Sequence, residues 1–280
     1  MAVGHFNIGA IIQARLGSTR LPNKVLMPLP INSENTIISH IINQLKEVKL
    51  ISKIVVASSS SEINDTLENY LKHLEVSCFR GDENDVLSRF YQINNLYNFD
   101  YIIRLTGDNP VIDRNYLIAF IENCIIQDLD YSYSNNLPLG CNFEIFKSKE
   151  LVKVFSGAPS LYDKEHVTPS IRKNAADSSL YHFNLLGNTP ELRLTIDYPT
   201  DYAFMEIIFS KLKDQEITIK KILKIIEQEP WLTEINKENY QKKEHDSLKA
   251  EIIDILPVVK GRELTKLENF LENVIKKNNL

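Results

Sequence analysis

Apolar and polar positions alternate along the first 210 residues in a pattern that predicts strands followed by helices. Short apolar runs, typical of buried strands, cover residues 8–13, 54–57, 76–79 and 101–105. Segments with apolar residues at helical spacing cover residues 36–46, 62–73, 85–97 and 115–127. This alternation is typical of a mostly parallel sheet with helices on both faces. We therefore expect a three-layer α/β/α, Rossmann-like fold.

The pattern changes after residue 130. Short strand candidates at 131–134, 142–146, 181–185 and 193–196 are separated by Pro and Gly turns and by a predicted helix at 148–155. The chain becomes helical from residue 217, and residues 236–246, which are nearly all polar, predict an exposed connection. An apolar stripe within residues 263–276 predicts a further helix. We therefore expect C-terminal helices beyond the central sheet.

Composition excludes several classes of protein. The formal net charge is −5 and the isoelectric point is near 5.8, so the basic surface of a nucleic-acid-binding protein is missing. The three cysteines, Cys78, Cys124 and Cys141, form no C-x-x-C pair, which argues against a disulfide framework or a zinc site. Residues 1–7 show no secretory leader, and no run approaches the roughly 18 apolar residues of a membrane span. We expect a cytoplasmic protein with no nucleic-acid or membrane partner.

The first predicted strand leads into a loop with the sequence Ala14-Arg15-Leu16-Gly17-Ser18-Thr19-Arg20-Leu21-Pro22-Asn23-Lys24. Gly17 allows close approach to an anion, Ser18 and Thr19 supply hydroxyl donors, and the two arginines and the lysine supply positive charge. The loop matches neither the P-loop nor the G-x-G-x-x-G fingerprint, which disfavours a kinase or a dehydrogenase. Its composition suits a triphosphate.

Two aspartates follow predicted strands. Asp108 lies in Thr-Gly-Asp-Asn-Pro, and Asp197 lies in Thr-Ile-Asp-Tyr-Pro-Thr-Asp. Nucleotidyl transfer brings an anionic acceptor to an anionic phosphate, so we expect Asp108 and Asp197 to hold a Mg²⁺ ion. The structural alternatives are an Asx turn at Asp108 and a helix N-cap at Asp197. We assign Asp201 to the N-cap of the helix that follows.

These motifs resemble the cytidylyltransferases that activate acidic sugars, such as the 3-deoxy-manno-octulosonate and acylneuraminate enzymes. The loop is similar to A-R-x-x-S-T-R-L-P-x-K of the branch associated with spore-coat and surface polysaccharides, and the resemblance covers residues 8–245. It implies a nucleotide-diphospho-sugar transferase fold that binds CTP, with metal-holding aspartates at Asp108 and Asp197. The nucleotide-binding residues that it implies are Ala14, Arg15, Gly17, Ser18, Thr19, Arg20, Lys24, Ser58, Arg80 and Asp108.

The same resemblance places acceptor recognition in two later motifs. Residues 138–146 resemble P-x-G-x-[DN]-x-E-x-F, and residues 165–169 read E-H-V-T-P. The acceptor residues expected from these motifs and their neighbours are Asn135, Asn142, Glu144, Glu165 and His166, with Arg172 and Arg193 pairing an acceptor carboxylate. The alternative for His166 is a core histidine satisfied by Glu165. Many members carry Asp where this chain has Asn142, which suggests an unusual acceptor.

The sequence thus predicts a cytidylyltransferase that transfers CMP from CTP to an acidic sugar or to a sugar or polyol phosphate, with release of pyrophosphate. Arg15 and Lys24 would neutralise the triphosphate. We expect a nucleotidyltransferase domain over residues 1–215, with an acceptor and dimerisation region at about 131–195, a helical extension over 216–280, and a homodimer. The alternatives are a UTP- or GTP-dependent nucleotidyltransferase, a glycosyltransferase of the same fold, and a non-catalytic nucleotide-binding protein.

Overall fold

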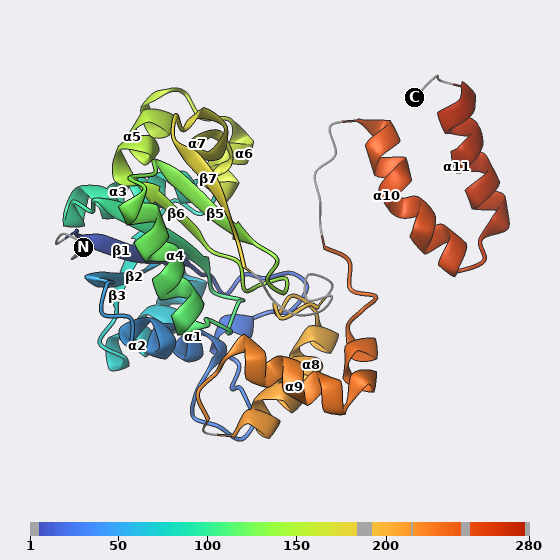
Figure 1. Ribbon diagram of the computed structural model, residues 1–280, viewed down its shortest axis with the longest axis horizontal. Helices are drawn as coiled ribbons and strands as arrows, with labels where there is room; N and C mark the ends of the chain where they lie inside the picture. Colours follow the sequence, from blue (N-terminus) through green and yellow to red (C-terminus); the bar gives the residue numbers. More distant parts are fainter. Residues whose placement is uncertain (1–5, 184–191, 214, 242–246, 278–280) are drawn as a thin grey trace. The chain divides into compact units, whose positions relative to one another are not determined.

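The structure is a computed structural model that describes residues 6–183, 192–213, 215–241 and 247–277. The chain divides into two compact units, residues 1–239 and 240–280 (Figure 1). The predicted boundary at 215/216 differs from this division, because Ile219, Ile222 and Leu232 are buried in the core of the first unit.

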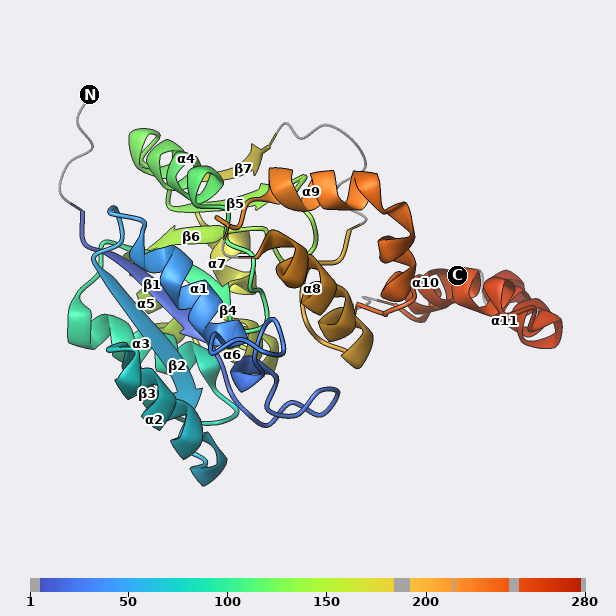
Figure 2. The ribbon, with the colours of Figure 1, turned by 90° about the horizontal axis from the view of Figure 1, so that it is seen from below.

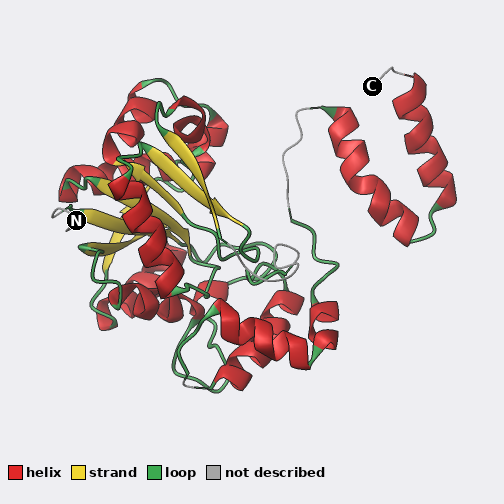
Figure 3. Cartoon of the chain, viewed as in Figure 1, coloured by secondary structure: helices red, strands yellow, loops and turns green. Residues whose placement is uncertain are grey.

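One seven-stranded sheet forms the centre of the first unit (Figure 3). Its strands are β1 (Ile8–Gln13), β2 (Lys53–Ser59), β3 (Ser77–Gly81), β4 (Tyr101–Thr106), β5 (Tyr131–Asn135), β6 (Glu144–Lys147) and β7 (Ser178–His182). Their order is β3-β2-β1-β4-β6-β5-β7, and β6 pairs antiparallel with both of its neighbours while the other pairs are parallel. The prediction of a mostly parallel α/β sheet is confirmed.

Helices cover both faces of the sheet (Figure 2). The α-helices of the first unit are α1 (Ile37–Lys46), α2 (Asp65–His73), α3 (Val86–Tyr97), α4 (Arg114–Ile126), α5 (Ser148–Ser156), α6 (Leu161–His166), α7 (Pro169–Asn174), α8 (Pro199–Leu212) and α9 (Ile219–Gln228). Three short 3₁₀ segments are η1 (Lys24–Leu26), η2 (Glu62–Asn64) and η4 (Pro230–Ile235).

The sheet separates two hydrophobic clusters. Apolar residues of α1, α2, α4, α8 and α9 pack on one face, where Ile12 and Ile103 point, and those of α3, α5 and α7 pack on the other, where Ile11 and Ile102 point. Successive residues of a strand point to opposite faces, so the continuous apolar runs of β1 and β4 supply both clusters. Strands β1 and β4 pair directly in parallel, so their carboxyl ends lie together.

Two sequence predictions in the first unit differ from the structure. Residues 193–196 form no strand but only an isolated bridge between Leu139 and Arg193, whose side chain enters the polar cluster described below, while Leu194 and Ile196 are buried in the hydrophobic core. The predicted exposed connection at 236–246 begins with a buried residue, Asn236, which is 4% exposed. The predicted strand at 181–185 is observed as β7 (Ser178–His182), and residues 184–185 lie outside the described residues.

The second unit contains an antiparallel helical hairpin, α10 (Leu248–Gly261) and α11 (Thr265–Lys277). Lys260 of α10 pairs with Glu268 at 3.3 Å and with Glu272 at 3.4 Å. Ile252 and Val259 are buried, but most of its large apolar side chains are exposed, namely Leu248, Ile253, Ile255, Val258, Leu264, Leu267 and Phe270. Within the described ranges, no helix is long and apolar enough to cross a membrane.

Candidate active site

The loops that follow β1 and β4 meet at one edge of the sheet. The two strands pair in parallel and Gln13 lies beside Thr106, so residues 14–24 and 107–110 leave the sheet as neighbours. Ligands of open α/β sheets bind at this carboxyl edge. Gly107 is required there, because a Cβ on it would lie 2.8 Å from Ala14 Cβ. The fold therefore brings the predicted phosphate loop next to the Asp108 motif.

Asn64 fixes the start of the phosphate loop. Its side chain is 1% exposed, its Oδ1 accepts a hydrogen bond from Leu16 N at 2.8 Å, and its Nδ2 donates to Ser59 Oγ at 2.8 Å. These bonds link the loop after β1 to the end of β2. The sequence analysis missed this residue, since a single asparagine before a helix carries no signal of a tertiary contact.

Lys24 joins the two aspartates. Its Nζ donates to Asp108 Oδ2 at 2.8 Å, to Asp197 Oδ1 at 2.9 Å and to the Ile196 carbonyl at 2.8 Å. The Lys24 side chain is 9% exposed, and it enters the site from η1, directly after the loop. Thr106 Oγ1 also donates to Asp108 Oδ1 at 2.6 Å. Three of the four predicted catalytic residues thus lie in one contact group.

The electrostatics of this group favour charged side chains. Burial opposes the charged form of Lys24, but the charges of Asp108 and Asp197 outweigh it, so the pKa of Lys24 is raised. Burial likewise opposes ionisation of Asp108, but the Lys24 charge and the hydrogen bonds from Lys24 and Thr106 lower the pKa of Asp108. The group is an ionised lysine held between carboxylates.

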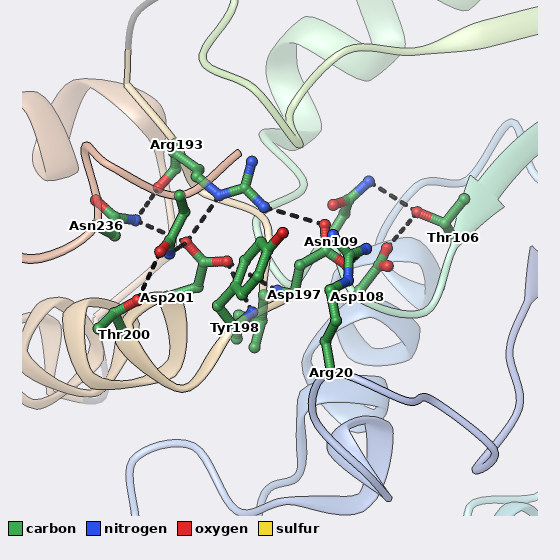
Figure 4. Close-up of polar contacts among 12 residues, drawn as sticks. Arg20, Thr106, Asp108, Asn109, Arg193, Asp197, Tyr198, Thr200, Asp201 and Asn236 are labelled. Atoms are coloured by element: carbon green, nitrogen blue, oxygen red, sulfur yellow. Dashed lines mark hydrogen bonds and ion pairs between the residues drawn. The ribbon is translucent and has the colours of Figure 1, made fainter. Parts of the chain in front are cut away.

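Behind Asp197 lies a second polar cluster, centred on Asp201 (Figure 4). The Asp201 side chain is fully buried, and Arg193, which is 6% exposed, donates from Nε to Asp201 Oδ1 at 2.8 Å and from Nη2 to Asp197 Oδ2 at 3.1 Å. Further donors to Asp201 are Asn236 Nδ2 (3.1 Å), Asn239 Nδ2 (2.7 Å), Asp197 N (3.0 Å) and Tyr198 N (3.0 Å).

The role predicted for Asp201 needs a correction. Helix α8 begins at Pro199 with Tyr198 as its N-cap, so Asp201 is the third helical residue and not the cap. It still satisfies the backbone N–H groups of Asp197 and Tyr198 ahead of the helix. The N-cap alternative for Asp197 is wrong for the same reason. The side chain of Asp197 instead accepts from Lys24 and Arg193.

The other residues of the phosphate loop differ in position. Arg20 Nη2 lies 3.0 Å from Asp197 Oδ1, and its guanidinium lies over the Tyr198 ring at 4.8 Å. Arg15 is exposed and pairs with Glu83 at 3.6 Å, so the structure does not bring it into the Lys24 group. The neighbouring Gly17 and Thr19 are exposed and Ser18 is half-buried, while Ala14 N donates to the Ala57 carbonyl at 3.2 Å.

The residues predicted to bind the base lie at the ends of β2 and β3. Ser58 is fully buried, and among the described residues its Oγ has no hydrogen-bond partner. Arg80 is engaged, since it pairs with Asp65 at 2.9 Å and Glu68 at 2.8 Å and donates to the carbonyls of Ser59 and Ser61. Arg80 is therefore fixed in place by protein groups.

The first acceptor motif, residues 138–146, lines a small pocket next to Asp108. The pocket has a volume of about 60 Å³, and its lining includes Arg104, Thr106, Asn109, Gly140, Asn142 and Glu144. Gly140 has φ 96°, and a Cβ there would lie 2.8 Å from Thr195 N. The predicted residues Asn142 and Glu144 thus belong to the pocket, and Asn135 closes β5 with a buried Oδ1 that has no partner among the described residues.

The E-H-V-T-P motif spans the end of α6 and the start of α7. Glu165 is exposed, which argues against the core-histidine alternative, and the half-buried His166 ring packs edge-on against Tyr162 with centroids 4.5 Å apart. Arg172 lies over the Tyr133 ring at 3.8 Å. Arg193, also predicted to pair an acceptor carboxylate, is already held by Asp197 and Asp201.

The carboxylates next to Lys24 suit magnesium better than a soft metal. Within the described residues, no group of three or more His, Cys, Asp or Glu side chains gathers in a way that could hold a metal ion. Mg²⁺ commonly takes only one or two protein carboxylates and fills its remaining positions with phosphate oxygens and water. Asp108 and Asp197, whose oxygens converge on one ammonium group, supply two such carboxylates.

A D-x-D sequence, the metal motif common in glycosyltransferases, occurs at Asp128-Leu129-Asp130. It lies before β5, at the opposite edge of the sheet from Asp108. Both aspartates pair with Lys147, at 2.7 Å and 3.2 Å, and Asp130 also pairs with Lys149 at 2.6 Å. The exposed Asp128 and the buried Asp130 are thus paired with lysines, and the motif gives no support to the glycosyltransferase alternative.

Comparisons with known proteins show the family of the chain. A family model described as cytidylyltransferase matches residues 9–246. The chain is 34% identical over 232 residues to the spore coat polysaccharide biosynthesis protein SpsF of Bacillus subtilis, which covers 79% of this chain and 94% of that protein. The structure of a cytidylyltransferase from Leptospira borgpetersenii has a TM-score of 0.75 at 28% identity, covering 86% of this chain and 100% of that one.

A more distant structure supports the fold alone. The CMP:2-keto-3-deoxy-manno-octonic acid synthetase in complex with CTP has a TM-score of 0.58 at 13% identity, over 74% of this chain and 100% of that one. The family resemblance and the nucleotide-diphospho-sugar transferase fold expected from the sequence are therefore confirmed. The chain belongs to the cytidylyltransferase family and is a nucleotidyltransferase.

Proposed function

We propose that this enzyme transfers CMP from CTP to an acidic sugar, or to a sugar or polyol phosphate, in the biosynthesis of a surface glycan. The observation that carries the proposal is the buried Lys24 ammonium between Asp108 and Asp197, directly after a loop rich in phosphate-binding groups. The name of the relative SpsF, a spore coat polysaccharide biosynthesis protein, supports the glycan pathway.

In the proposed reaction, an oxygen of the acceptor attacks the α-phosphorus of CTP. The bond from this phosphorus to the bridging oxygen of the β-phosphate breaks, pyrophosphate leaves, and an acceptor hydroxyl loses its proton to solvent. Lys24 and Arg20 stabilise the negative charge that develops on the phosphates, while Arg15, which is exposed, can turn toward the triphosphate. Positioning of the two reactants supplies much of the rate enhancement.

Asp108 and Asp197 are the residues proposed to hold Mg²⁺. A bound Mg²⁺ ion offsets the charge of the triphosphate and lowers the pKa of a coordinated acceptor hydroxyl. Lys24 favours the ionised form of Asp108 and holds both carboxylates in place before the nucleotide arrives. Arg193 and Asp201 hold Asp197 from behind and so position its carboxylate.

We extend the proposal to a homodimer. Hairpins as small as that of α10 and α11 rarely bury enough apolar surface to be stable alone. The seven exposed apolar side chains of this hairpin are covered, in this proposal, by a second copy of the chain. The net charge of −5 on each chain does not oppose such an apolar contact strongly at physiological ionic strength.

The test is a pyrophosphate-release assay with each of the four NTPs and Mg²⁺, run across a panel of ulosonic acids and sugar phosphates. We expect release with CTP in the presence of at least one anionic sugar. Release with UTP or GTP in preference to CTP would replace the nucleotide in this proposal. If every combination is silent while CTP still binds in calorimetry, the chain is a nucleotide-binding protein without this activity.

A further inference from the structure

A row of side chains crosses the sheet next to the pocket. Arg104 of β4 lies opposite Glu144 of β6, and Glu144 lies opposite Tyr133 of β5. Paired residues of neighbouring strands point to the same face of the sheet, so these three side chains stand side by side. Glu144 was predicted from its motif, but Arg104 was not, because a single arginine near the end of an apolar strand gives no signal of a binding role.

Glu144 acts as a fixed anchor in this row. Its Oε2 accepts from Arg104 Nη1 at 2.9 Å, its Oε1 accepts from Tyr131 Oη at 2.6 Å, and Thr168 Oγ1 lies 3.1 and 3.2 Å from its two oxygens. A carboxylate with this many donors has one orientation. It therefore holds the guanidinium of Arg104 in one plane.

Arg104 still has donor capacity that the protein does not use. Its side chain is 17% exposed and lines the pocket, and its Nε is buried without a hydrogen-bond partner among the described residues. Asn109, which lines the same pocket, has an Oδ1 that also lacks a partner there. Buried polar groups are rarely left unpaired, so an unpaired donor and an unpaired acceptor at one pocket wall point to a ligand that completes them.

The local charge points to the sign of that ligand. Burial and Glu144 raise the pKa of Tyr131, whereas the positive charges of Arg172 and Arg104 oppose this rise. Both guanidinium groups therefore lie close enough to the Tyr131 hydroxyl to affect its ionisation. The half-buried Glu144 pairs with Arg104, whereas Arg172 lies over the neighbouring Tyr133 ring and has no carboxylate partner among the described residues, which leaves one positive charge uncompensated. Asp108, which precedes Asn109 of the pocket wall, is already paired with Lys24.

We propose that Arg104, oriented by Glu144, binds the anionic group of the acceptor and thereby makes the enzyme select acceptors that carry a carboxylate or a phosphate. This inference rests on the proposed function, and it assigns the charge selection to Arg104 in place of Arg193. An arginine held by a carboxylate on one edge presents its other edge to a planar or tetrahedral anion. Glu144 is a positioning residue in this arrangement.

The first test needs no turnover. Proton–nitrogen NMR spectra of the arginine side chains are recorded during titration with pyruvate, glucose 1-phosphate and, as a neutral control, methyl glucoside. We expect the Arg104 Nε–H signal to shift with at least one of the two anions and not with methyl glucoside. Comparing pyruvate with glucose 1-phosphate separates a carboxylate from a phosphate preference. The affinity should fall at least about tenfold in Arg104→Gln and also in Glu144→Gln.

The second test uses the acceptor found in the pyrophosphate-release panel. Arg104→Lys and Arg104→Gln should raise the KM for this acceptor at least about tenfold and leave the KM for CTP within about twofold, because a bound anion is a charged hydrogen-bond partner. Arg114→Gln is the matched control, since Arg114 pairs with Glu47 and Glu216 outside the pocket. A structural role alone would change stability without separating the two KM values.

Two outcomes overturn the inference: no anion shifts the Arg104 signal, or Arg104→Gln keeps the wild-type KM for the acceptor. If Arg104→Gln does not fold, Arg104→Lys and Glu144→Gln decide by the same criteria. The protein could also bind anions at Arg104 but release no pyrophosphate with any NTP. That result contradicts the proposed function and leaves the assignment of Arg104 intact. The two failures are therefore distinguishable.

Discussion

Asp201→Asn tests whether the cluster behind Asp197 is held together by a buried charge. Asp201 is fully buried and accepts all its hydrogen bonds through two carboxylate oxygens, from donors on Arg193, Asp197, Tyr198, Asn236 and Asn239. The substitution keeps the shape but turns one oxygen into an NH₂ group. From the sequence alone a small cost would be expected, because Asn caps helices about as well as Asp.

The structure predicts a larger cost. If the NH₂ group replaces Oδ2, it faces the N–H groups of Asp197 and Tyr198, and each buried donor left unpaired costs about 1–3 kcal/mol. Arg193 also loses one of its two carboxylate partners, and breaking a buried ion pair costs about 3–5 kcal/mol. These costs overlap, so we expect a loss of about 3–5 kcal/mol in the free energy of unfolding.

Urea denaturation measures this loss as a decrease in the midpoint urea concentration with an unchanged m-value. For a unit of this size, the same loss corresponds to a Tm decrease of roughly 6–20 °C. Glu206→Gln is the matched control, because Glu206 lies on the same helix, is half-buried, and among the described residues accepts only from Ile31 N and Ser210 Oγ. A loss below about 1 kcal/mol for Asp201→Asn, or one equal to that of Glu206→Gln, would refute the reasoning.

Three further predictions follow from the site and from the hairpin. The pKa of Asp108 is lowered from 3.8 in the folded state, so its pairing with Lys24 stabilises the fold above pH 3.8, and this stability is lost as the pH falls through the lowered pKa. In urea unfolding between pH 5 and pH 2, the stability of Asp108→Asn should therefore fall less with acid than that of the wild type, and an equal fall contradicts this. Asn64→Ala should cost about 2 kcal/mol in unfolding free energy and raise the KM for CTP, because Leu16 N loses its acceptor; an unchanged KM would show that the phosphate loop does not depend on this contact. Light scattering should give a dimer for the full chain and a monomer for a chain ending at residue 246, and a monomeric full chain contradicts the proposed assembly.

Much of the fold could be predicted from the sequence because the buried strands carry a strong local signal. Continuous apolar runs predicted β1, β2 and β4, and the helical spacing from Ile37 to Leu45 predicted α1, whose N-cap is Thr36. The segment at 193–196 was mistaken for a strand because its apolar residues alternate with polar ones. Arg193 of this segment and Asp197, which follows it, are buried in ion pairs, and no periodicity can show such pairs.

The site was predictable where its chemistry lies in contiguous motifs. The loop ending at Lys24 and the two aspartates were identified in this way, and the fold brings them together across 84 and 173 residues of sequence. Arg104 and Asn64 were missed because their roles arise from strand register and from a tertiary contact. Arg15 was placed beside Lys24 in the prediction, whereas its side chain is exposed and pairs with Glu83.

The central claim is that Lys24, held between Asp108 and Asp197, stabilises the triphosphate during nucleotidyl transfer. The most direct test is the rate of pyrophosphate release from CTP and Mg²⁺ by Lys24→Ala, compared with Lys49→Ala, which removes an exposed lysine outside the site. We predict that Lys24→Ala loses about 2–4 kcal/mol of transition-state stabilisation in kcat/KM for CTP, while Lys49→Ala matches the wild type. Wild-type kcat/KM in a folded Lys24→Ala enzyme would contradict the account.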